Sequence, residues 1–212
     1  MRVHILIGVM AVLTASEAAA DDAALGRLTA LMAGVFDTAA QVDGEARTGV
    51  AEASRHERRH VVYAPIAAPH IGRAVLFRQE SRDGRLLVRD LAVFEPDAGN
   101  GVIRMWLRRI VDADGFADLH LKPELWPRVA FDPAYGGKCP FHWRPDGDGF
   151  IGALDGGRCE IVSNAGRQMA FESRWELSAA GLSIFDNTYD GDGRLLSGRA
   201  DRVPTLYQRV RP

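Results

Sequence analysis

The chain has 212 residues and a formal net charge of −2, with 47% hydrophobic and 25% charged residues. This length suits one domain that buries a full core without metals or many disulfides. The balanced charge excludes the basic footprint of a nucleic-acid-binding protein.

The first twenty residues have the layout of a secretory signal. Arg2 and His4 form a basic start, residues 5–13 are hydrophobic except for Gly8, and small alanines occupy 18–20. The hydrophobic run is shorter than the roughly 20 residues that span a membrane. The sequence therefore predicts a signal peptide over residues 1–20 and a periplasmic or secreted mature chain, 21–212, without a transmembrane segment.

One helix is predicted over residues 22–41. Its apolar residues recur at helical spacing, and Asp21 and Asp22 offer carboxylates to cap its first turn. These apolar residues are Leu25, Leu28, Leu31, Met32, Val35 and Phe36. A polar, alanine-rich linker is expected over residues 42–54.

From residue 60 onward, apolar and polar residues mainly alternate, which is typical of half-buried strands. Turn pairs such as Asp83-Gly84, Asp148-Gly149 and Asp192-Gly193 separate the strands and favour hairpins. Residues 117–137 contain three prolines and are expected to be irregular. The pattern predicts a mainly β domain, an antiparallel barrel of about ten strands with an N-terminal helix. The expected strands are 60–65, 73–80, 85–94, 102–111, 139–144, 150–154, 159–163, 168–177, 182–188 and 205–210.

Cys139 and Cys159 are the only cysteines. In an exported protein two thiols usually pair, so we expect a structural disulfide. The alternative is a reactive thiol, but there is no C-x-x-C motif, and neither cysteine lies at an obvious helix start.

Two motifs match catalytic or cofactor patterns but lack the required context. Residues 56–60 read H-E-x-x-H, a zinc motif when helical, yet the β-branched and aromatic residues 61–63 favour a strand. Residues 147–152 read G-x-G-x-x-G, but they fall at an expected hairpin turn instead of between a strand and a helix.

Three Asp-x-Asp-Gly segments, at 112–115, 146–149 and 190–193, resemble fragments of calcium loops. Each lacks the remaining carboxylates of such a loop, so we favour turn residues and leave weak calcium binding open as the alternative. Nucleophile elbows, phosphate-binding loops and Cys/His zinc clusters are absent from the sequence. We therefore predict no catalytic side chain, no metal site and no required cofactor.

Polar residues on the expected strands are a subtler signal. Arg78 and Glu80 share one face of their strand, and Arg89 shares a face with Leu87, Leu91 and Val93. An arginine among apolar residues can line a barrel pocket for an acidic ligand. The alternative is that such residues lie on a solvated outer face.

The layout as a whole resembles the CpcT/CpeT (T-type) phycobiliprotein chromophore lyases. The resemblance is carried by residues 31–36 with Gln41, Glu80, Arg89, Cys139 with Trp143, 149–152, 157–159, 172–173, 183–186 with Asp190, Gly198 and 207–209. It covers almost the whole mature chain. The sequence departs from the family at Leu87-Val88-Arg89, where the family has Arg-Gln-Arg, and at Asp186-Asn187-Thr188, where it has Asp-Arg-Gly.

Membership would imply a calycin-like barrel, often a homodimer, that binds a linear tetrapyrrole (bilin) and delivers it to a cysteine of an acceptor protein. On that reading Arg89 binds a propionate. Glu80, Asp186 and Asp190 face the pyrrole N–H groups, and Trp143 lines the ligand site. The alternatives are a periplasmic calycin-like carrier without transfer activity and a structural protein whose barrel is filled.

Overall fold

The computed structural model describes residues 8–97, 100–133, 138–163 and 165–210, with side chains from residue 19 onward. The start of the predicted signal peptide, with Arg2 and His4, lies outside the described residues, as do residues 134–137 of the predicted irregular segment. Within the described part, no helix is both long and apolar enough to cross a membrane.

The N-terminal region differs from the single helix predicted over 22–41. Helix α1 (Gly8–Met32) ends earlier, and β1 (Gly34–Asp37) and α2 (Ala39–Arg47) follow it. Gly34 has a φ of +153°, and a Cβ there would lie 2.1 Å from the Arg209 guanidinium, so glycine suits the break between helix and strand. The prediction was wrong because Val35 and Phe36 fit the helical spacing although they lie in a strand.

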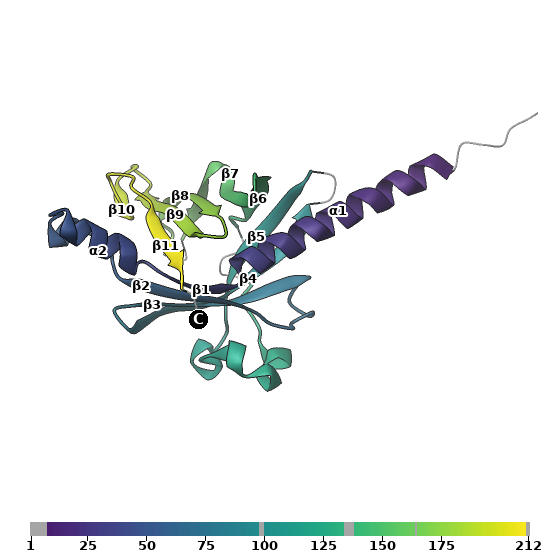
Figure 1. The fold of residues 1–212 in the computed structure, drawn as a ribbon, viewed down its shortest axis with the longest axis horizontal. Helices are drawn as coiled ribbons and strands as arrows, with labels where there is room; N and C mark the ends of the chain where they lie inside the picture. The colour runs from purple at the N-terminus through teal and green to yellow at the C-terminus, as the bar shows by residue number, and fades with distance from the viewer. Residues whose placement is uncertain (1–7, 98–99, 134–137, 164, 211–212) are drawn as a thin grey trace, which may run out of the picture.

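Ten antiparallel strands close into a barrel, as predicted (Figure 1). Around the ring the order is β9-β11-β1-β2-β3-β4-β5-β6-β7-β8, and β8 pairs back with β9. The short β10 pairs with β9 outside the ring. The strands are β2 (Arg59–Pro65), β3 (Ala74–Arg82), β4 (Arg85–Asp97), β5 (Val102–Arg109), β6 (Phe141–Asp146), β7 (Gly149–Val162), β8 (Gln168–Leu177), β9 (Gly181–Asp190), β10 (Leu195–Ser197) and β11 (Thr205–Arg209).

Two sequence expectations for the strands need correction. The segments 150–154 and 159–163 form one strand, β7, whose register shifts between Ala153 and Arg158 around two positive-φ glycines. The sequence analysis missed β1 and β10. The predicted Asp-Gly turn at 83–84 is present, with φ values of 49° and 75°, as in a tight hairpin.

The barrel core is apolar at the end covered by α1. Leu25, Leu28 and Met32 of α1 are buried against strand residues such as Phe94 and Trp143. Figure 1 shows α1 and α2 at opposite ends of the barrel, with the first half of α1 projecting away from it. The helix therefore closes one end of the barrel with its second half.

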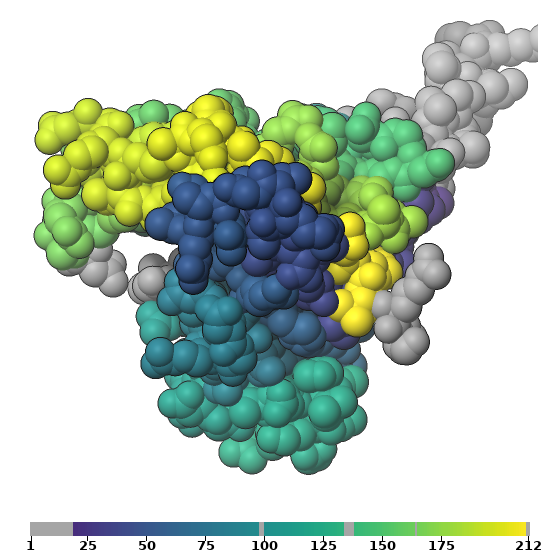
Figure 2. All heavy atoms as spheres, turned by 60° about the vertical axis from the view of Figure 1, so that its left-hand side comes forward, coloured from purple at the N-terminus to yellow at the C-terminus, as the bar shows by residue number. Residues whose placement is uncertain are grey.

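A second, smaller core lies outside the barrel. Phe77, Leu91 and Val93, on the outer face of β3 and β4, are buried under Leu119 and Val129. The covering segment carries three short 3₁₀ helices and appears in teal at the bottom of Figures 1 and 2. These helices are η2 (Ala113–Phe116), η3 (Leu119–Leu121) and η4 (Pro123–Arg128), and a further one, η1 (Glu52–Ser54), follows α2.

Cys139 and Cys159 lie at disulfide distance, as predicted, with their Cα atoms 5.9 Å apart. Cys139 precedes β6, and Cys159 lies in the second half of β7. The bond therefore joins two strand regions of the barrel wall.

Candidate functional site

In the half of the barrel away from α1, the solvent exposure of the inward-facing residues differs between the two sides of the wall. On β1 to β4, inward residues such as Phe36, Tyr63 and Asp90 are buried. On β5 and β7 to β9, Ser173 is also buried, but the other inward residues of this half are accessible: Arg109 and Asp186 are exposed, and the rest are half-buried. We call this set the accessible inner wall; it consists of Leu107, Arg109, Cys159, Ile161, Met169, Phe171, Ile184, Asp186 and Thr188.

Asp186 is the carboxylate at the centre of this wall. It pairs in register with Ser173, whose hydroxyl donates to its Oδ1, and the Trp175 indole Nε1–H donates to the same oxygen at 3.1 Å. Burial raises the pKa of Asp186, and the two hydrogen bonds oppose this. The side chain is nevertheless exposed. A residue on a concave wall has both properties, the raised pKa and the exposure, because protein surrounds it on most sides while one side stays open to solvent.

A buried charged cluster on β3 and β4 lies close enough to affect Asp186. The Arg78 guanidinium lowers the pKa of Asp186, and Glu80 raises it. Arg78 Nε lies 3.0 Å from Asp90 Oδ1 in an ion pair that lacks hydrogen-bond geometry. Burial raises the pKa of Asp90 to about 6 despite the nearby Arg78. The cluster therefore places both charge signs beside the accessible inner wall.

Glu80 is held by neighbours on two other strands, β2 and β11. Its Oε1 accepts hydrogen bonds from the Tyr207 hydroxyl at 3.1 Å and from Arg59 at 3.0 Å. Glu57 in turn accepts from Arg59 and Arg82. This network covers the β2–β3 side of the barrel end opposite α1.

The structure brings together two of the five ligand-binding residues expected from the resemblance. Glu80 and Asp186 both face the barrel interior near Arg78. Trp143 also faces inward, but it is fully buried, packed edge-on against Trp175 at 6.2 Å between ring centroids. Its Nε1 is buried without a hydrogen-bond partner.

The other two expected residues have different surroundings. Arg89 lies on the outer face, where it donates to Gln79 at 3.2 Å and to the Ala113 carbonyl at 2.9 Å. Asp190 pairs in register with Met169 and so shares the inner face at the end of β9, where it accepts from the backbone N–H groups of Asp192 and Arg194 in the β9–β10 turn. Their assignment to ligand binding stays a prediction from the resemblance.

Sequence reasoning missed Arg109 as a candidate. It pairs in register with Asp90, so it shares the inner face with that residue. The sequence analysis did not consider the alternation at this end of the expected strand 102–111. Because successive strand residues point to opposite faces, it would have placed Arg109 on the face opposite to Arg108.

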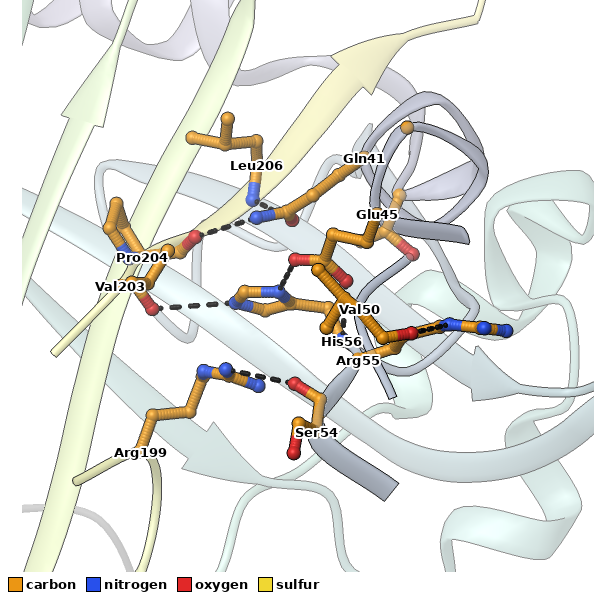
Figure 3. A network of polar contacts seen from close by, with 12 residues as sticks. Gln41, Glu45, Val50, Ser54, Arg55, His56, Arg199, Val203, Pro204 and Leu206 are labelled. Atoms are coloured by element: carbon orange, nitrogen blue, oxygen red, sulfur yellow. Dashed lines mark hydrogen bonds and ion pairs between the residues drawn. The ribbon is translucent and has the colours of Figure 1, made fainter. Parts of the chain in front are cut away.

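A polar network ties α2 to β11 and to the segment before it (Figure 3). The Gln41 amide donates to the Pro204 carbonyl at 3.0 Å and accepts from Leu206 N–H at 2.8 Å. His56 is buried, with Nδ1 at Glu45 and Nε2 3.4 Å from the Val203 carbonyl. Thus His56 holds two chain segments together.

The motifs set aside in the sequence have the structural context expected for them. His60 lies in strand β2, and Gly149 begins β7 after a hairpin turn, with no helix following. In the part of the chain that the structure describes, no group of three or more His, Cys, Asp or Glu side chains is arranged to hold a metal ion.

A surface cleft of about 570 Å³ lies between α1 and the β2–β3 connection. Its lining includes Thr29, Ile66 and Arg73 and none of the predicted site residues. The accessible inner wall is therefore a separate feature.

No protein-family model matches this chain, and no curated protein matches it. The similar solved structures include two proteins. The CRL protein of Arabidopsis, in selenomethionine form, has 13% identity and a TM-score of 0.65 over 92% of this chain and 98% of its own. The T-type phycobiliprotein lyase CpeT from Prochlorococcus phage P-HM1 has 10% identity and a TM-score of 0.52 over 88% and 97%. At these identities the likeness shows a shared fold.

Proposed function

We propose that this protein binds a linear tetrapyrrole of the bilin class on the accessible inner wall. The observation that carries the proposal is the inward yet exposed carboxylate of Asp186, beside an indole and near buried arginine and glutamate side chains. Pyrrole N–H groups are donors that a carboxylate accepts, and propionates are acceptors that a guanidinium binds. The shared fold with a T-type lyase supports this choice of ligand.

The two charge signs that a bilin requires occur on the same inner wall. Asp186 supplies an acceptor, and Arg109 supplies an inward, exposed cation. Phe171 and Ile184 are half-buried on the same surface and offer apolar contact for the flat ring system. This combination of apolar wall and few polar groups is typical of small-molecule sites.

We further propose that the bilin is passed to a cysteine of an acceptor protein, as the resemblance implies. Both cysteines of this chain are bonded to each other, so in this state the chain offers no thiol to keep the bilin covalently. This favours a protein that delivers its ligand. An exported carrier without transfer activity is the alternative.

Binding is tested by visible absorption titration of the purified protein with phycocyanobilin and biliverdin. We expect a sharpened, red-shifted band that saturates at one bilin per chain. Asp186→Asn should weaken binding about tenfold to a hundredfold, as for loss of a hydrogen bond to a charged group. Glu176→Gln removes an exposed carboxylate from the outer face of neighbouring β8 and should leave affinity unchanged.

Arg89→Ala distinguishes an inner from an outer ligand site. Retained affinity in this variant, together with loss in Asp186→Asn, places the bilin inside the barrel. The reverse pattern would place it on the outer face and overturn the inner-wall assignment. A spectrum identical to that of free bilin would reject the bilin proposal itself.

Transfer is a separate measurement. Loaded protein is mixed with a phycobiliprotein apo-subunit that carries its acceptor cysteine, and covalent bilin is detected by fluorescence after denaturing electrophoresis. Labelled acceptor above the level given by free bilin indicates a lyase. Binding without such labelling indicates the carrier.

A further inference from the structure

Cys159 belongs to the accessible inner wall through its place in the sheet. It pairs in register with Phe171 of β8, and Phe171 pairs with Thr188 of β9, so the three residues form one row across the inner face. Cys159 is half-buried and packs against the barrel core, as do Phe171 and Ile184. A cysteine is therefore part of the surface to which we assign the bilin.

The same face carries Asp186, one row further along β9. Asp186 pairs with Ser173, two residues from the pair of Thr188 and Phe171. From the usual spacing of strands and of residues along them, the Cα atoms of Cys159 and Asp186 are about 12 Å apart across β8. A bilin is a chain of four pyrrole rings. An inner ring can thus donate its N–H to Asp186 while a terminal ring lies over Phe171 towards Cys159.

The disulfide determines whether Cys159 can react. Cys139 and Cys159 lie at disulfide distance and are the only cysteines of the chain. A thiolate is a nucleophile, and a sulfur in a disulfide is not. A dithiol reductant supplies two electrons and two protons, is itself oxidised to a disulfide, and leaves two thiols here. Of these, Cys159 lies in the row of inner-wall residues, whereas Cys139 precedes β6, outside the strand pairing.

We propose that reduction of the Cys139–Cys159 bond makes Cys159 an attachment site for the bilin, so that the chain keeps a ligand that it otherwise releases. This inference deepens the proposed function and rests on it for the identity of the ligand. The Cys159 thiolate adds to the exocyclic carbon of the bilin's ethylidene group, and a C–S bond forms. The electron pair of the C=C bond takes up a proton at the adjacent ring carbon. The thiol is thus added across the double bond, and no group leaves.

Two single variants separate Cys159 from a general effect of free thiols. Cys139→Ser leaves Cys159 as the only thiol, and Cys159→Ser leaves Cys139, so both lack the disulfide without any reductant. Each is incubated with phycocyanobilin, and covalent bilin is measured by fluorescence after denaturing electrophoresis and located by mass spectrometry of peptides. We expect at least tenfold more attachment in Cys139→Ser, up to one bilin per chain on Cys159. Equal attachment in the two variants would overturn the proposal.

The native protein gives the same comparison without substitution, and it keeps the test valid if a variant fails to fold. The oxidised protein should stay unlabelled, and the dithiol-treated protein should carry one bilin on Cys159. Failure of attachment in the reduced native protein and in Cys139→Ser, with binding still present in the absorption titration, would overturn the attachment and leave the bilin site standing. Failure of both binding and attachment would reject the two proposals together.

Attachment on the inner wall also requires prior binding at Asp186. In the Cys139→Ser background, Asp186→Asn should lower the rate of attachment about tenfold to a hundredfold, the same factor as expected for its affinity. Glu176→Gln in that background is the matched control, because this carboxylate lies on the outer face of β8, and its rate should stay unchanged. An unchanged rate with Asp186→Asn would show that Cys159 reacts with bilin directly from solution, which would overturn the proposal.

Discussion

The packing around Trp143 leads to a quantitative prediction for Gly152→Ala. A Cβ at Gly152 would lie 2.6 Å from two ring atoms of Trp143, closer than real Cβ contacts. The ring has little room to move, because it is fully buried and packs edge-on against Trp175. Overpacking of this kind costs about 1–3 kcal/mol. We therefore expect the free energy of unfolding to fall by about 2 kcal/mol.

Gly26→Ala is the matched control for this substitution. An added methyl group at Gly26 meets nothing within 4 Å, and the residue lies inside α1. Replacing a helical glycine by alanine stabilises by roughly 0.5–1 kcal/mol. Replacing glycine by alanine should thus lower the free energy of unfolding at position 152 and raise it at position 26.

Urea unfolding followed by tryptophan fluorescence measures both variants. A native or higher midpoint for Gly152→Ala would show that Trp143 moves aside easily. That result would refute the assignment of Trp143 to a rigid core and would restore it as a residue able to contact ligand, as the resemblance implied.

Three further predictions concern the α1 end, the disulfide and Asp186. Leu28→Ala should lower the unfolding free energy by about 2–5 kcal/mol, since Leu28 is fully buried in the barrel core; a loss below 1 kcal/mol in urea unfolding would argue against a helix packed into the barrel. Replacing both cysteines by serine should cost about 3 kcal/mol, measured in the same way, and thiol counting of the denatured native protein should find no free thiol. Because the pKa of Asp186 is raised, its contribution to stability is fully present below the ordinary aspartate pKa and is lost as pH rises through the raised value. The stability–pH curve of Asp186→Asn should lack this decline. Bilin affinity should change in the opposite direction, falling as acid protonates Asp186, and a pH-independent native affinity would remove Asp186 from the site.

Much of the barrel could be predicted from the sequence because alternation and turn residues are local signals. Strand β8 has the bounds predicted for it, and the disulfide was predicted from the expected export and from the number of cysteines. Strand β1 could not be recognised, since it is four residues long and its Val35 and Phe36 also satisfy the helical spacing. Its strand state depends on pairing with β2, the next strand, and with β11, which lies far along the chain.

The site was harder to predict because alternation defines two faces without saying which is inner. Arg89 shares its face with Leu91 and Val93, and an apolar face is normally the interior. Here that face is the outer one, buried under Leu119 and Val129 of the irregular segment. Glu80 and Asp186, which the resemblance offered as candidates, lie on the inner face, and their role in ligand binding stays a prediction. Arg109 needed the register with Asp90.

The position of β1 also has a consequence for how the chain folds. β1 pairs on one side with β2, its neighbour in sequence, and on the other with β11, the last strand. The ring therefore cannot close until nearly the whole chain is available, and its closure depends on contacts of very long sequence separation, which form slowly. Until then β1 and β9 present unpaired edges, which are sites of aggregation. In a chain shortened before Thr205, the edges of β1 and β9 would stay unpaired. The last strand, β11, therefore governs whether the rest of the barrel is protected from aggregation.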